Sequence, residues 1–358
     1  MKFKKVFVLA MCLALLFSVC PTASAVEAET KTMSVHFINV GQGDSTLIQL
    51  PNGENMLIDA GTSSAGKTVT KYLKAQKIKK IDYLIATHPH DDHIGGLPAV
   101  IKDYEIGAIY APRAVASTKS YENFLKAVQN KGLSINTAKA GTDIIKEKDL
   151  KISILAPAKS TYTDLNNYSI VLKITYGKTS FLFMGDAEQL IEKEIKANLV
   201  KANVIKIGHH GSTSSTSAAF LKSVSPQSAV ISCGKKNSYG HPAQQTLDTL
   251  ANAGAAIYRT DKVGNIVFTS DGTRLSVDKK PTAHTPSNAP TTQGGSQGSA
   301  NNSGAGATNT QSSVVYVAKT GTKYHKNGCK YLEKSKIEIS LEKAKKSYGP
   351  CSVCKPAA

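Results

Sequence analysis

Short runs of β-branched and other apolar residues alternate with amphipathic stretches through most of the chain, from Met33 to Asp278. A short apolar run bounded by polar residues predicts a strand, whereas apolar residues three and four apart predict a helix. Strands interspersed with helices in this way predict a layered α/β domain. The predicted strands cover 35–40, 46–50, 55–58, 82–86, 150–155, 170–176, 179–184, 204–207, 229–232 and 264–268, and the predicted helices cover 66–76, 118–130, 188–197, 217–224 and 243–253.

Residues 1–25 have the pattern of a cleavable signal peptide. Three lysines precede an apolar run over 6–19, and small residues lead up to the expected cleavage after Ala25. A membrane anchor is the competing interpretation, but the run is short and ends before Pro21. Cys20 would suit a lipoprotein, but the residues before it form a poor lipidation site. We therefore expect export and a mature protein that is secreted, extracellular or associated with the cell wall.

The chain changes character after residue 279. Residues 280–313 consist mainly of Pro, Thr, Ser, Gly, Asn, Gln and Ala, so they predict a flexible, disordered linker that cannot bury enough surface to fold. Apolar residues return over 314–317, where a small C-terminal module begins. The mature chain is therefore expected to contain a layered domain over 26–279, this linker, and a module over 314–358.

Positive charge is concentrated toward the C-terminus. The formal net charge is +18, and the module over 314–358 contains ten Lys and three Glu. An anionic partner such as DNA or another polymer suits this charge, and a merely solubilising surface is the alternative interpretation. After the N-terminal segment, the sequence predicts no membrane-spanning stretch.

Histidines gather directly after the predicted strand that ends at Ala86. His88 and His90 are two residues apart, so extended backbone would direct them to the same side. Asp92 and His93 follow and can turn toward a second point, and loops at strand ends often carry sites in α/β folds. Three imidazoles and a carboxylate this close together are costly to bury unless a cation binds them. The cluster therefore predicts a metal site.

Further motifs follow along the chain. They are FINVGQGDS at 37–45, LIDAG at 57–61, NYSIVL at 167–172, FMGD at 183–186, KIGHHGS at 206–212 and NSYGHP at 237–242. The His-x-His-x-Asp-His cluster after a strand resembles the signature of the metallo-β-lactamase superfamily. The ordered set, over about residues 33–278, resembles the hydrolase module of the bacterial competence DNA-uptake channel protein and its secreted free-standing relatives.

This resemblance implies a four-layer αββα sandwich with a two-metal site along one edge. Asp186, an acceptor-only carboxylate after an apolar strand, would bridge the two divalent ions. Zinc is the expected metal, and manganese is the alternative. The remaining ligands would be His88 and His90 for the first ion, and Asp92, His93 and His210 for the second.

Other side chains would support this site. His210 is preferred narrowly to His209 as a ligand, because a shift of one residue reverses which side chain points inward. The other histidine and His241 would lie behind the ligands or contact an anionic substrate, and Asp59 would hold the metal loops by hydrogen bonds. The loop over 41–45 either offers backbone N–H groups to an anion or is only a tight turn.

One feature departs from the superfamily pattern. No histidine lies between Ile94 and Gly208 to give the first ion a third imidazole. Asn167 lies where an amide oxygen or an outer hydrogen bond would substitute. Such a site is expected to be looser, richer in oxygen and tolerant of manganese, or filled only with substrate.

Two such ions would ionise water near neutral pH and stabilise charge on the attacking and leaving oxygens, with Asp92 or Asp186 steering the nucleophile. We therefore expect a secreted metal-dependent hydrolase. The resemblance favours a phosphodiesterase or nuclease that acts on DNA or a related polyanion through a metal-bound hydroxide. One alternative is a hydrolase of a small ester, lactone or β-lactam, or of a phosphodiester in a surface polymer. Another is a non-catalytic protein that binds nucleic acid or the cell wall.

The C-terminal module carries a second set of metal-ligand residues, a His-x3-Cys followed later by a Cys-x2-Cys. This set suits one closed tetrahedral zinc site, and a module this small has too little core to fold without such a link. It resembles the Cys/His modules appended to some secreted nucleases. The alternative is a disulfide among the three cysteines, which an oxidising compartment permits. The structural zinc ligands would be His325, Cys329, Cys351 and Cys354, with a helix over 337–344 packed on 314–317.

Overall fold

The computed structural model divides the chain into two compact units, Met1–Pro290 and Thr291–Ala358. The expected signal peptide over 1–25 lies outside the described residues, as does most of the expected linker over 280–313. Within the described part, no helix has the length and apolar character needed to cross a membrane. The described residues are 31–284, 286, 314–318, 321–326, 329–332, 336–341, 344–345 and 348–354.

The first unit contains two mixed sheets, and one of them has eight strands. In spatial order they are β15 (Leu275–Val277), β14 (Ile266–Ser270), β1 (Met33–Phe37), β2 (Thr46–Gln49), β3 (Asn55–Ile58), β4 (Lys80–Ile85), β5 (Glu105–Ala111) and β6 (Ile135–Thr137). The strands from β3 to β6 run parallel to one another, whereas the strands from β15 to β3 pair antiparallel.

The other sheet has seven strands. In spatial order they are β13 (Ala256–Arg259), β12 (Ser228–Ile231), β11 (Val204–Lys206), β10 (Thr179–Phe183), β9 (Val171–Tyr176), β8 (Leu150–Ala156) and β7 (Asp143–Lys146). The strands from β10 to β13 are parallel, and those from β7 to β10 are antiparallel.

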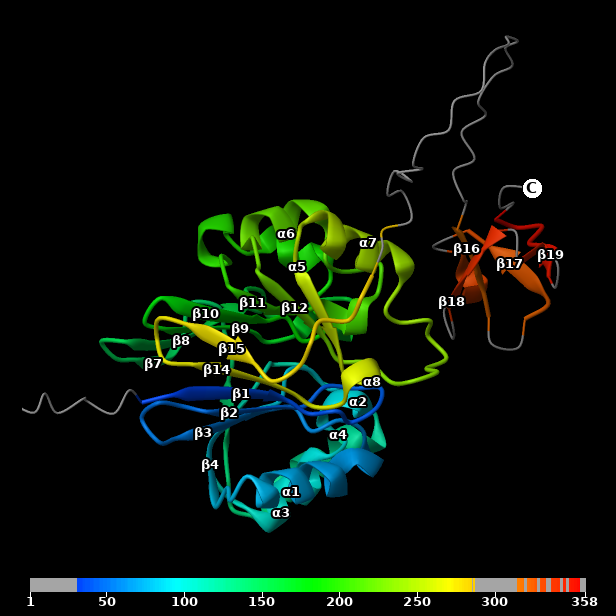
Figure 1. Cartoon of the computed structure of the whole chain (residues 1–358). Helices are drawn as coiled ribbons and strands as arrows, with labels where there is room; N and C mark the ends of the chain where they lie inside the picture. Colours follow the sequence, from blue (N-terminus) through cyan, green and yellow to red (C-terminus); the bar gives the residue numbers. More distant parts are fainter. Residues whose placement is uncertain are drawn as a thin grey trace, which may run out of the picture. The chain divides into compact units, whose positions relative to one another are not determined.

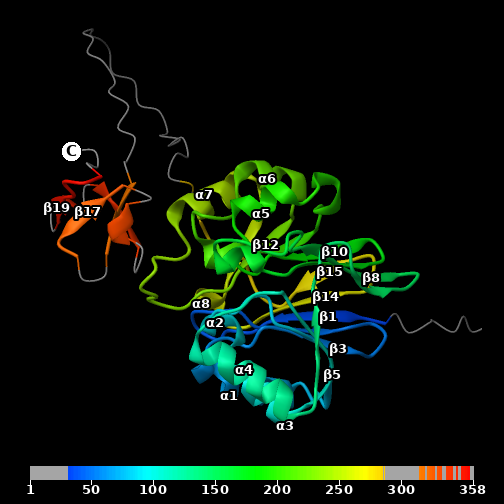
Figure 2. The same ribbon diagram turned by 180° about the vertical axis from the view of Figure 1, so that it is seen from behind.

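Helices cover the outer face of each sheet (Figure 1). The view from behind shows the same four layers (Figure 2). The predicted αββα sandwich is therefore confirmed. The eight-stranded sheet is covered by α1 (Gly66–Ala75), α3 (Leu97–Asp103) and α4 (Lys119–Asn130), and the seven-stranded sheet by α5 (Gln189–Glu194), α6 (Ala218–Val224) and α7 (Gln244–Asn252). Shorter helices are η1 (Ser63–Ala65), α2 (Asp91–Ile94), η2 (Leu165–Tyr168), η3 (Ala197–Leu199), η4 (Gly208–Gly211) and α8 (Thr260–Val263).

Side-chain alternation along the strands divides the apolar residues among three packed cores. Phe37, Phe181 and Phe268 lie in the core between the two sheets. Because successive strand residues point to opposite faces, Leu182 of β10 instead packs toward the helices over its own sheet. Leu57 of β3 does the same on the other side of the sandwich. The sheets are thus apolar on both faces, which leaves polar chemistry to the loops at their edges.

The first unit continues past residue 279. The backbone N–H of Thr282 donates to the carbonyl of Ile257 at 2.6 Å, and His284 Nε2 lies 2.8 Å from Asp248 Oδ1. The first residues of the expected linker therefore lie against the layered unit.

The second unit has a four-stranded sheet in the order β18 (Ile337–Ser340), β16 (Val314–Val317), β17 (Lys323–His325) and β19 (Gly349–Pro350), with η5 (Lys330–Leu332) beside it. The prediction of a helix over 337–344 is wrong in its first half, because β18 pairs antiparallel with β16. Ile337 and Ile339 alternate with polar residues, which is a strand pattern. Helical backbone is present at Leu341 and Ala344, beyond the strand.

Candidate metal centre

Loops at the carboxyl ends of strands from both sheets meet at one edge of the sandwich. Asp59 follows β3 and Thr87 follows β4, and the Thr87 N–H donates to Asp59 Oδ1 at 2.8 Å. Asp186 follows β10 and His210 follows β11, and His210 Nε2 lies 3.5 Å from Asp186 Oδ2. Parallel neighbouring strands end at the same edge, so they bring together side chains that are far apart in the sequence.

Four of the predicted ligands each place one metal-binding atom within 4.8 Å of the others, namely Asp92, His93, Asp186 and His210. His93 Nε2 lies 3.2 Å from Asp186 Oδ1, and His210 Nε2 lies 3.1 Å from Asp92 Oδ2. All are buried except the partly buried Asp92. This is the set that the resemblance assigned to the second ion and the bridge. Two imidazoles and two carboxylates suit zinc or manganese.

The unpartnered atoms of this cluster fit a cation. His93 Nε2 and Asp186 Oδ1 face each other, and neither buried atom has a hydrogen-bond partner. A buried polar atom without a partner costs about 1–3 kcal/mol. A divalent ion bound by both atoms would satisfy both, so the residues present fit the metal that the fold implies.

His88 and His90 converge beside this cluster. His88 Nε2 lies 3.1 Å from His90 Nδ1 and 3.9 Å from Asp186 Oδ2. The other ring nitrogen of His88 faces the hydroxyls of Thr87 and Ser169, at 3.1 and 3.3 Å. The expected first site therefore offers two imidazoles and the second oxygen of Asp186.

Asp59 orients His93 from behind. Its Oδ2 lies 2.8 Å from His93 Nδ1, and its two oxygens accept from the N–H and hydroxyl of Thr87 at 2.8 and 2.6 Å. Asp59 is fully buried. A donor bond from Nδ1 to a carboxylate directs Nε2 of the same imidazole toward a metal. These are the loop-holding hydrogen bonds expected of Asp59.

Asp44 and Lys206 form a charged group behind His210, and sequence reasoning missed both. Asp44 Oδ1 lies 3.2 Å from His210 Nδ1, which also lies 2.9 Å from the carbonyl oxygen of Ser232. Lys206 Nζ is 2.6 Å from Asp44 Oδ2. Burial disfavours the charge on Asp44, but Lys206 and His210 hold its pKa below the usual value. Asp44 is in the FINVGQGDS motif and Lys206 opens KIGHHGS. The motifs therefore included both residues, but nothing in the sequence showed that the two side chains pair with each other.

Both adjacent histidines reach Asp186 because the backbone turns left-handed at η4. His209 and His210 have φ values of 48° and 53°, a region that costs a non-glycine residue about 1–3 kcal/mol. His209 Nε2 lies 3.8 Å from Asp186 Oδ2 and its Nδ1 lies 3.0 Å from the Ser214 hydroxyl. His210 lies in the four-residue cluster and His209 beside it. The expected alternation between in and out does not apply, since this segment is not a strand.

The two asparagines of η2 have different surroundings, and Asn167 makes outer hydrogen bonds, one of the two roles considered for it. The Asn167 side chain donates to Glu188 Oε2 at 3.3 Å and accepts from the Glu188 N–H at 3.4 Å. Its neighbour Asn166 lines the cleft at the cluster and has a buried, unpartnered Oδ1. The 3-10 turn directs these consecutive side chains differently, which the sequence alone could not show. Asn166 is therefore the amide oxygen placed to face a metal or substrate.

The cluster opens into a cleft of about 310 Å³. His241 lines this cleft, and its ring centroid is 5.6 Å from that of His209. Burial is the main cause that lowers the pKa of His241 to about 4, and the charge of the nearby His209 adds to it. The neutral ring of His241 can therefore contact a substrate without adding charge. The cleft is lined by Gln42, His90, Asp91, Asp92, Asn166, Asp186, His209, His210, Tyr239 and His241.

The loop over 41–45 packs against the metal loop. The N–H of Asp44 donates to the carbonyl of Asp92 at 3.0 Å. A Cβ on Gly43 would lie 2.4 Å from that same carbonyl oxygen, so only glycine permits this approach. The Asp44 N–H thus holds the metal loop, which favours the tight-turn interpretation over anion binding for this donor.

The histidines and carboxylates of the cluster shift each other's pKa values. Burial opposes the charge on His93, but the carboxylates around it, Asp186 foremost, hold its pKa well above the usual value. Burial likewise disfavours the charge on Asp186, whose pKa is nevertheless held well below its usual value by the surrounding histidines, His210 first. A protonated imidazole must lose the proton on its ligating nitrogen before it can bind a metal. A divalent cation would thus replace ring protons as the partner of these carboxylates.

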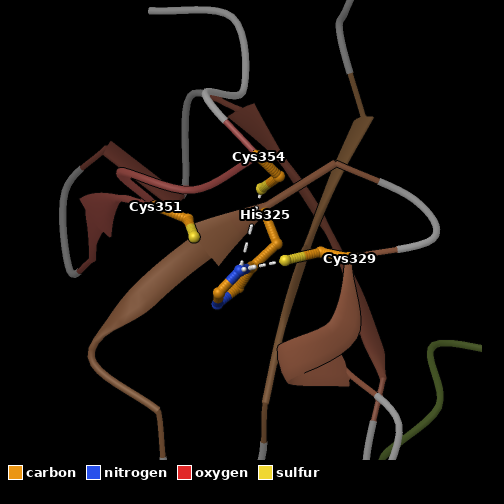
Figure 3. A group of neighbouring side chains, drawn as sticks. All are labelled: His325, Cys329, Cys351 and Cys354. Carbon is orange, nitrogen blue, oxygen red and sulfur yellow. Dashed lines mark hydrogen bonds between the residues drawn. The ribbon is translucent and has the colours of Figure 1, made fainter.

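The second unit brings its Cys/His residues together as predicted. His325, Cys329, Cys351 and Cys354 place their ligand atoms within 4.8 Å of one another, and their side chains converge (Figure 3). His325 Nδ1 lies 3.2 Å from Cys329 Sγ and 3.8 Å from Cys354 Sγ. All three cysteines are free thiols, which fits a metal site better than the disulfide alternative. Parallel pairing of β17 with β19 holds the two sequence groups side by side.

Comparison with known proteins identifies the family of the first unit. The model of the metallo-beta-lactamase superfamily matches residues 38–235. ComE operon protein 3 of Bacillus subtilis (strain 168) is 34% identical over 253 residues, which are 65% of this chain and 32% of that protein. Recombination protein 2 of Haemophilus influenzae is 30% identical over 260 residues, 71% of this chain and 31% of that protein.

A third competence-related protein is similar to this chain over a comparable length. Competence protein ComA of Neisseria gonorrhoeae is 30% identical over 234 residues, 64% of this chain and 31% of that protein. The chain thus spans about a third of the length of these relatives. The matched region contains the His/Asp cluster, and the fold is the one predicted. The chain belongs to the metallo-β-lactamase superfamily, as a metal-dependent hydrolase of that fold related to the competence proteins.

Proposed function

We propose that the protein is a phosphodiesterase that cleaves DNA or a related polyanion outside the cytoplasm. The observation that carries this proposal is the open cleft over the cluster of Asp92, His93, Asp186 and His210. Exposed Lys235 and Lys236 lie on the loop that carries one wall of the cleft. An anionic polymer would therefore meet positive charge on the loop that also carries the cleft residues Tyr239 and His241.

The residues at the cleft have different roles in the proposed hydrolysis. Asp92, His93, Asp186 and His210, with His88 and His90 beside them, would hold divalent metal, which would supply a nucleophile from water near neutral pH and neutralise charge on the attacking and leaving oxygens. The Asp59 carboxylate orients the His93 ring by accepting from its Nδ1, and the Ser232 carbonyl does the same for His210, with Asp44 beside it as an ion-pair partner. The neutral ring of His241 and the unpartnered oxygen of Asn166 face the space where a substrate would lie.

His209 lies between two carboxylates that favour its protonated form. Its Nε2 is 3.8 Å from Asp186 and its Nδ1 is 3.6 Å from Glu188 Oε1. Burial opposes its charge, but Asp186 and Glu188 raise its pKa above the usual value. A protonated His209 in the cleft wall would bind the phosphate or protonate the leaving oxygen.

The relatives support DNA as the polymer. Their names refer to competence and recombination, and the motif set resembles the hydrolase module of a DNA-uptake channel. The separate C-terminal unit, with its Cys/His cluster and excess of lysine, is a candidate tether to the same polyanion. Its charge would contribute affinity that weakens as salt is added.

Export is part of the proposal. The signal-peptide pattern over 1–25 supports it. Mass spectrometry of protein recovered from the culture medium should show a mature N-terminus at Val26. An intact Met1, or a lipid on Cys20, would contradict export by this route.

A substrate panel tests the activity. Mature protein loaded with zinc or with manganese should cleave single-stranded DNA and also hydrolyse bis-p-nitrophenyl phosphate. Hydrolysis of the small ester alone would favour a small-substrate or surface-polymer phosphodiesterase. Cleavage of a β-lactam or lactone alone would favour the other small-substrate class. Retention of DNA in a salt-sensitive manner, with no turnover of any substrate, would favour a binding protein.

A further inference from the structure

Tyr239 stands at the mouth of the metal cleft with 70% of its surface exposed. Single exposed apolar side chains are ordinary on protein surfaces. Tyr239 differs because it lines the same cleft as the metal ligands Asp186 and His210. Its position therefore connects an aromatic face in solvent with the reacting centre.

Stacked rings lead from Tyr239 to the metal ligands. The rings of Tyr239 and His241 are 5.7 Å apart between centroids, with an interplanar angle of 22°. The rings of His241 and His210 are 6.5 Å apart at 29°. Because His241 occupies one side of Tyr239 and the tyrosine is still mostly exposed, the other face of its ring is available to a ligand.

Hydrogen bonds fix the loop that presents Tyr239. The Asn237 amide donates to the carbonyls of Gly234 and His241 at 2.9 and 2.6 Å. Its oxygen accepts from the backbone N–H groups of Tyr239 and His241 at 3.2 and 3.0 Å. A ring held in place loses little conformational entropy when a ligand stacks on it.

We propose that Tyr239 is the stacking surface for an unpaired nucleobase next to the phosphodiester at the metal cluster. This inference rests on the proposed phosphodiesterase function and narrows its substrate to single-stranded nucleic acid. Every base has a π face that stacks on an aromatic ring, so the contact requires no particular sequence. Bases inside a duplex already stack on each other, and a wall polymer without bases would leave Tyr239 unused.

Two oligonucleotides of equal length test the proposal, oligothymidylate and its analogue made of abasic nucleotides. Both carry the same phosphates, so they differ only in what can stack. Wild-type metal-loaded protein should cleave oligothymidylate with the lower KM. Tyr239→Ala should raise that KM about 10-fold, and should affect the abasic analogue several-fold less. Tyr239→Phe should keep most of the wild-type preference, because it retains the ring. Leu199→Ala, a change at an exposed side chain that is not among the cleft-lining residues, should match wild type.

A binding measurement that needs no turnover gives a second readout. In an Asp186→Ala background, an oligonucleotide containing 2-aminopurine should lose fluorescence on binding, and the further change Tyr239→Ala should remove most of that quenching. Equal KM values for the two oligonucleotides in wild type, or equal penalties from Tyr239→Ala on both, would overturn the stacking role. If wild type cleaves neither oligonucleotide, the phosphodiesterase proposal fails on nucleic acid and the inference falls with it.

Discussion

Lys206 Nζ lies 2.6 Å from Asp44 Oδ2, and the two side chains are only 3% and 7% exposed. The other oxygen of Asp44 lies 3.2 Å from Nδ1 of the candidate metal ligand His210. Lys206 also donates to the carbonyl of Ile207 at 2.8 Å. A buried ion pair of this kind holds the ligand in orientation, while its net contribution to stability is small as long as both partners are present.

Removing one partner of this pair should be costly. Lys206→Met leaves Asp44 buried without its main counter-charge, so the free energy of unfolding should fall by about 3–5 kcal/mol. The double variant Lys206→Met/Asp44→Asn leaves neither charge unpaired and should recover part of that loss. Urea denaturation of metal-free protein measures both. A loss of unfolding free energy in the double variant that equals or exceeds the sum of the losses in Lys206→Met and Asp44→Asn would contradict the pairing.

Asp59→Asn should weaken metal binding without unfolding the domain. The amide keeps the size of the carboxylate but loses the charge that orients His93 through Nδ1. Changes at such outer partners usually cost about 10–100-fold in metal affinity. Competition with a fluorescent chelator measures the affinity, and Asp103→Asn, at an exposed position, is the matched control. Equal affinities for the two variants would show that Asp59 does not orient the ligand.

Gly43→Ala should impair hydrolysis through backbone displacement. The new Cβ would lie 2.4 Å from the Asp92 carbonyl oxygen, so the metal loop must move. A displacement of about 1 Å at a reacting centre can cost about 100-fold in rate. Gly53→Ala is the control, because Gly53 has a positive φ of 92° but nothing within 4 Å of its Cβ position. It should lose about 1–2 kcal/mol of stability and keep the hydrolytic rate. Similar rates for the two variants would contradict the steric account.

The C-terminal cluster should bind one zinc of its own. Cys351→Ser should therefore remove one zinc per chain, measured by elemental analysis of the full-length protein, while hydrolysis of bis-p-nitrophenyl phosphate continues. Four soft ligands in one closed set suit a structural zinc, and backbone N–H groups, that of Cys354 first, lower the pKa of the Cys351 thiol. An unchanged zinc content, or a native disulfide at Cys329, would contradict this assignment.

The sequence predicted the parts of the site that are local or carried by motifs. His88, His90, Asp92 and His93 lie within six positions of one another, so their chemistry is visible in a short segment. Alternating apolar runs and amphipathic stretches predicted a layered α/β domain, and the family resemblance added its four-layer αββα form. Asp186 and the His-His pair required the resemblance, because only the fold brings their loops to the first cluster.

Features that depend on local backbone or long-range pairing were not predictable. The 3-10 turn at η2 places the Asn166 side chain in the lining of the cleft and the Asn167 side chain against Glu188. No local pattern indicates that Lys206 pairs with Asp44 across two sheets. In the C-terminal unit, a helix was expected over 337–344, but long-range sheet pairing with β16 makes Ile337–Ser340 a strand.

Cleavage of end-labelled single-stranded DNA by wild type and Asp186→Ala tests the central claim most directly. Both proteins are stripped with EDTA and then supplied with zinc or manganese. Wild type should be inactive when stripped and active when reloaded, whereas Asp186→Ala should be slower by about 1,000-fold or more, since several kcal/mol of transition-state stabilisation depend on metals at this carboxylate. Cleavage by wild type in EDTA, or by Asp186→Ala at the wild-type rate, would contradict the assignment of metal-dependent DNA hydrolysis to this cluster.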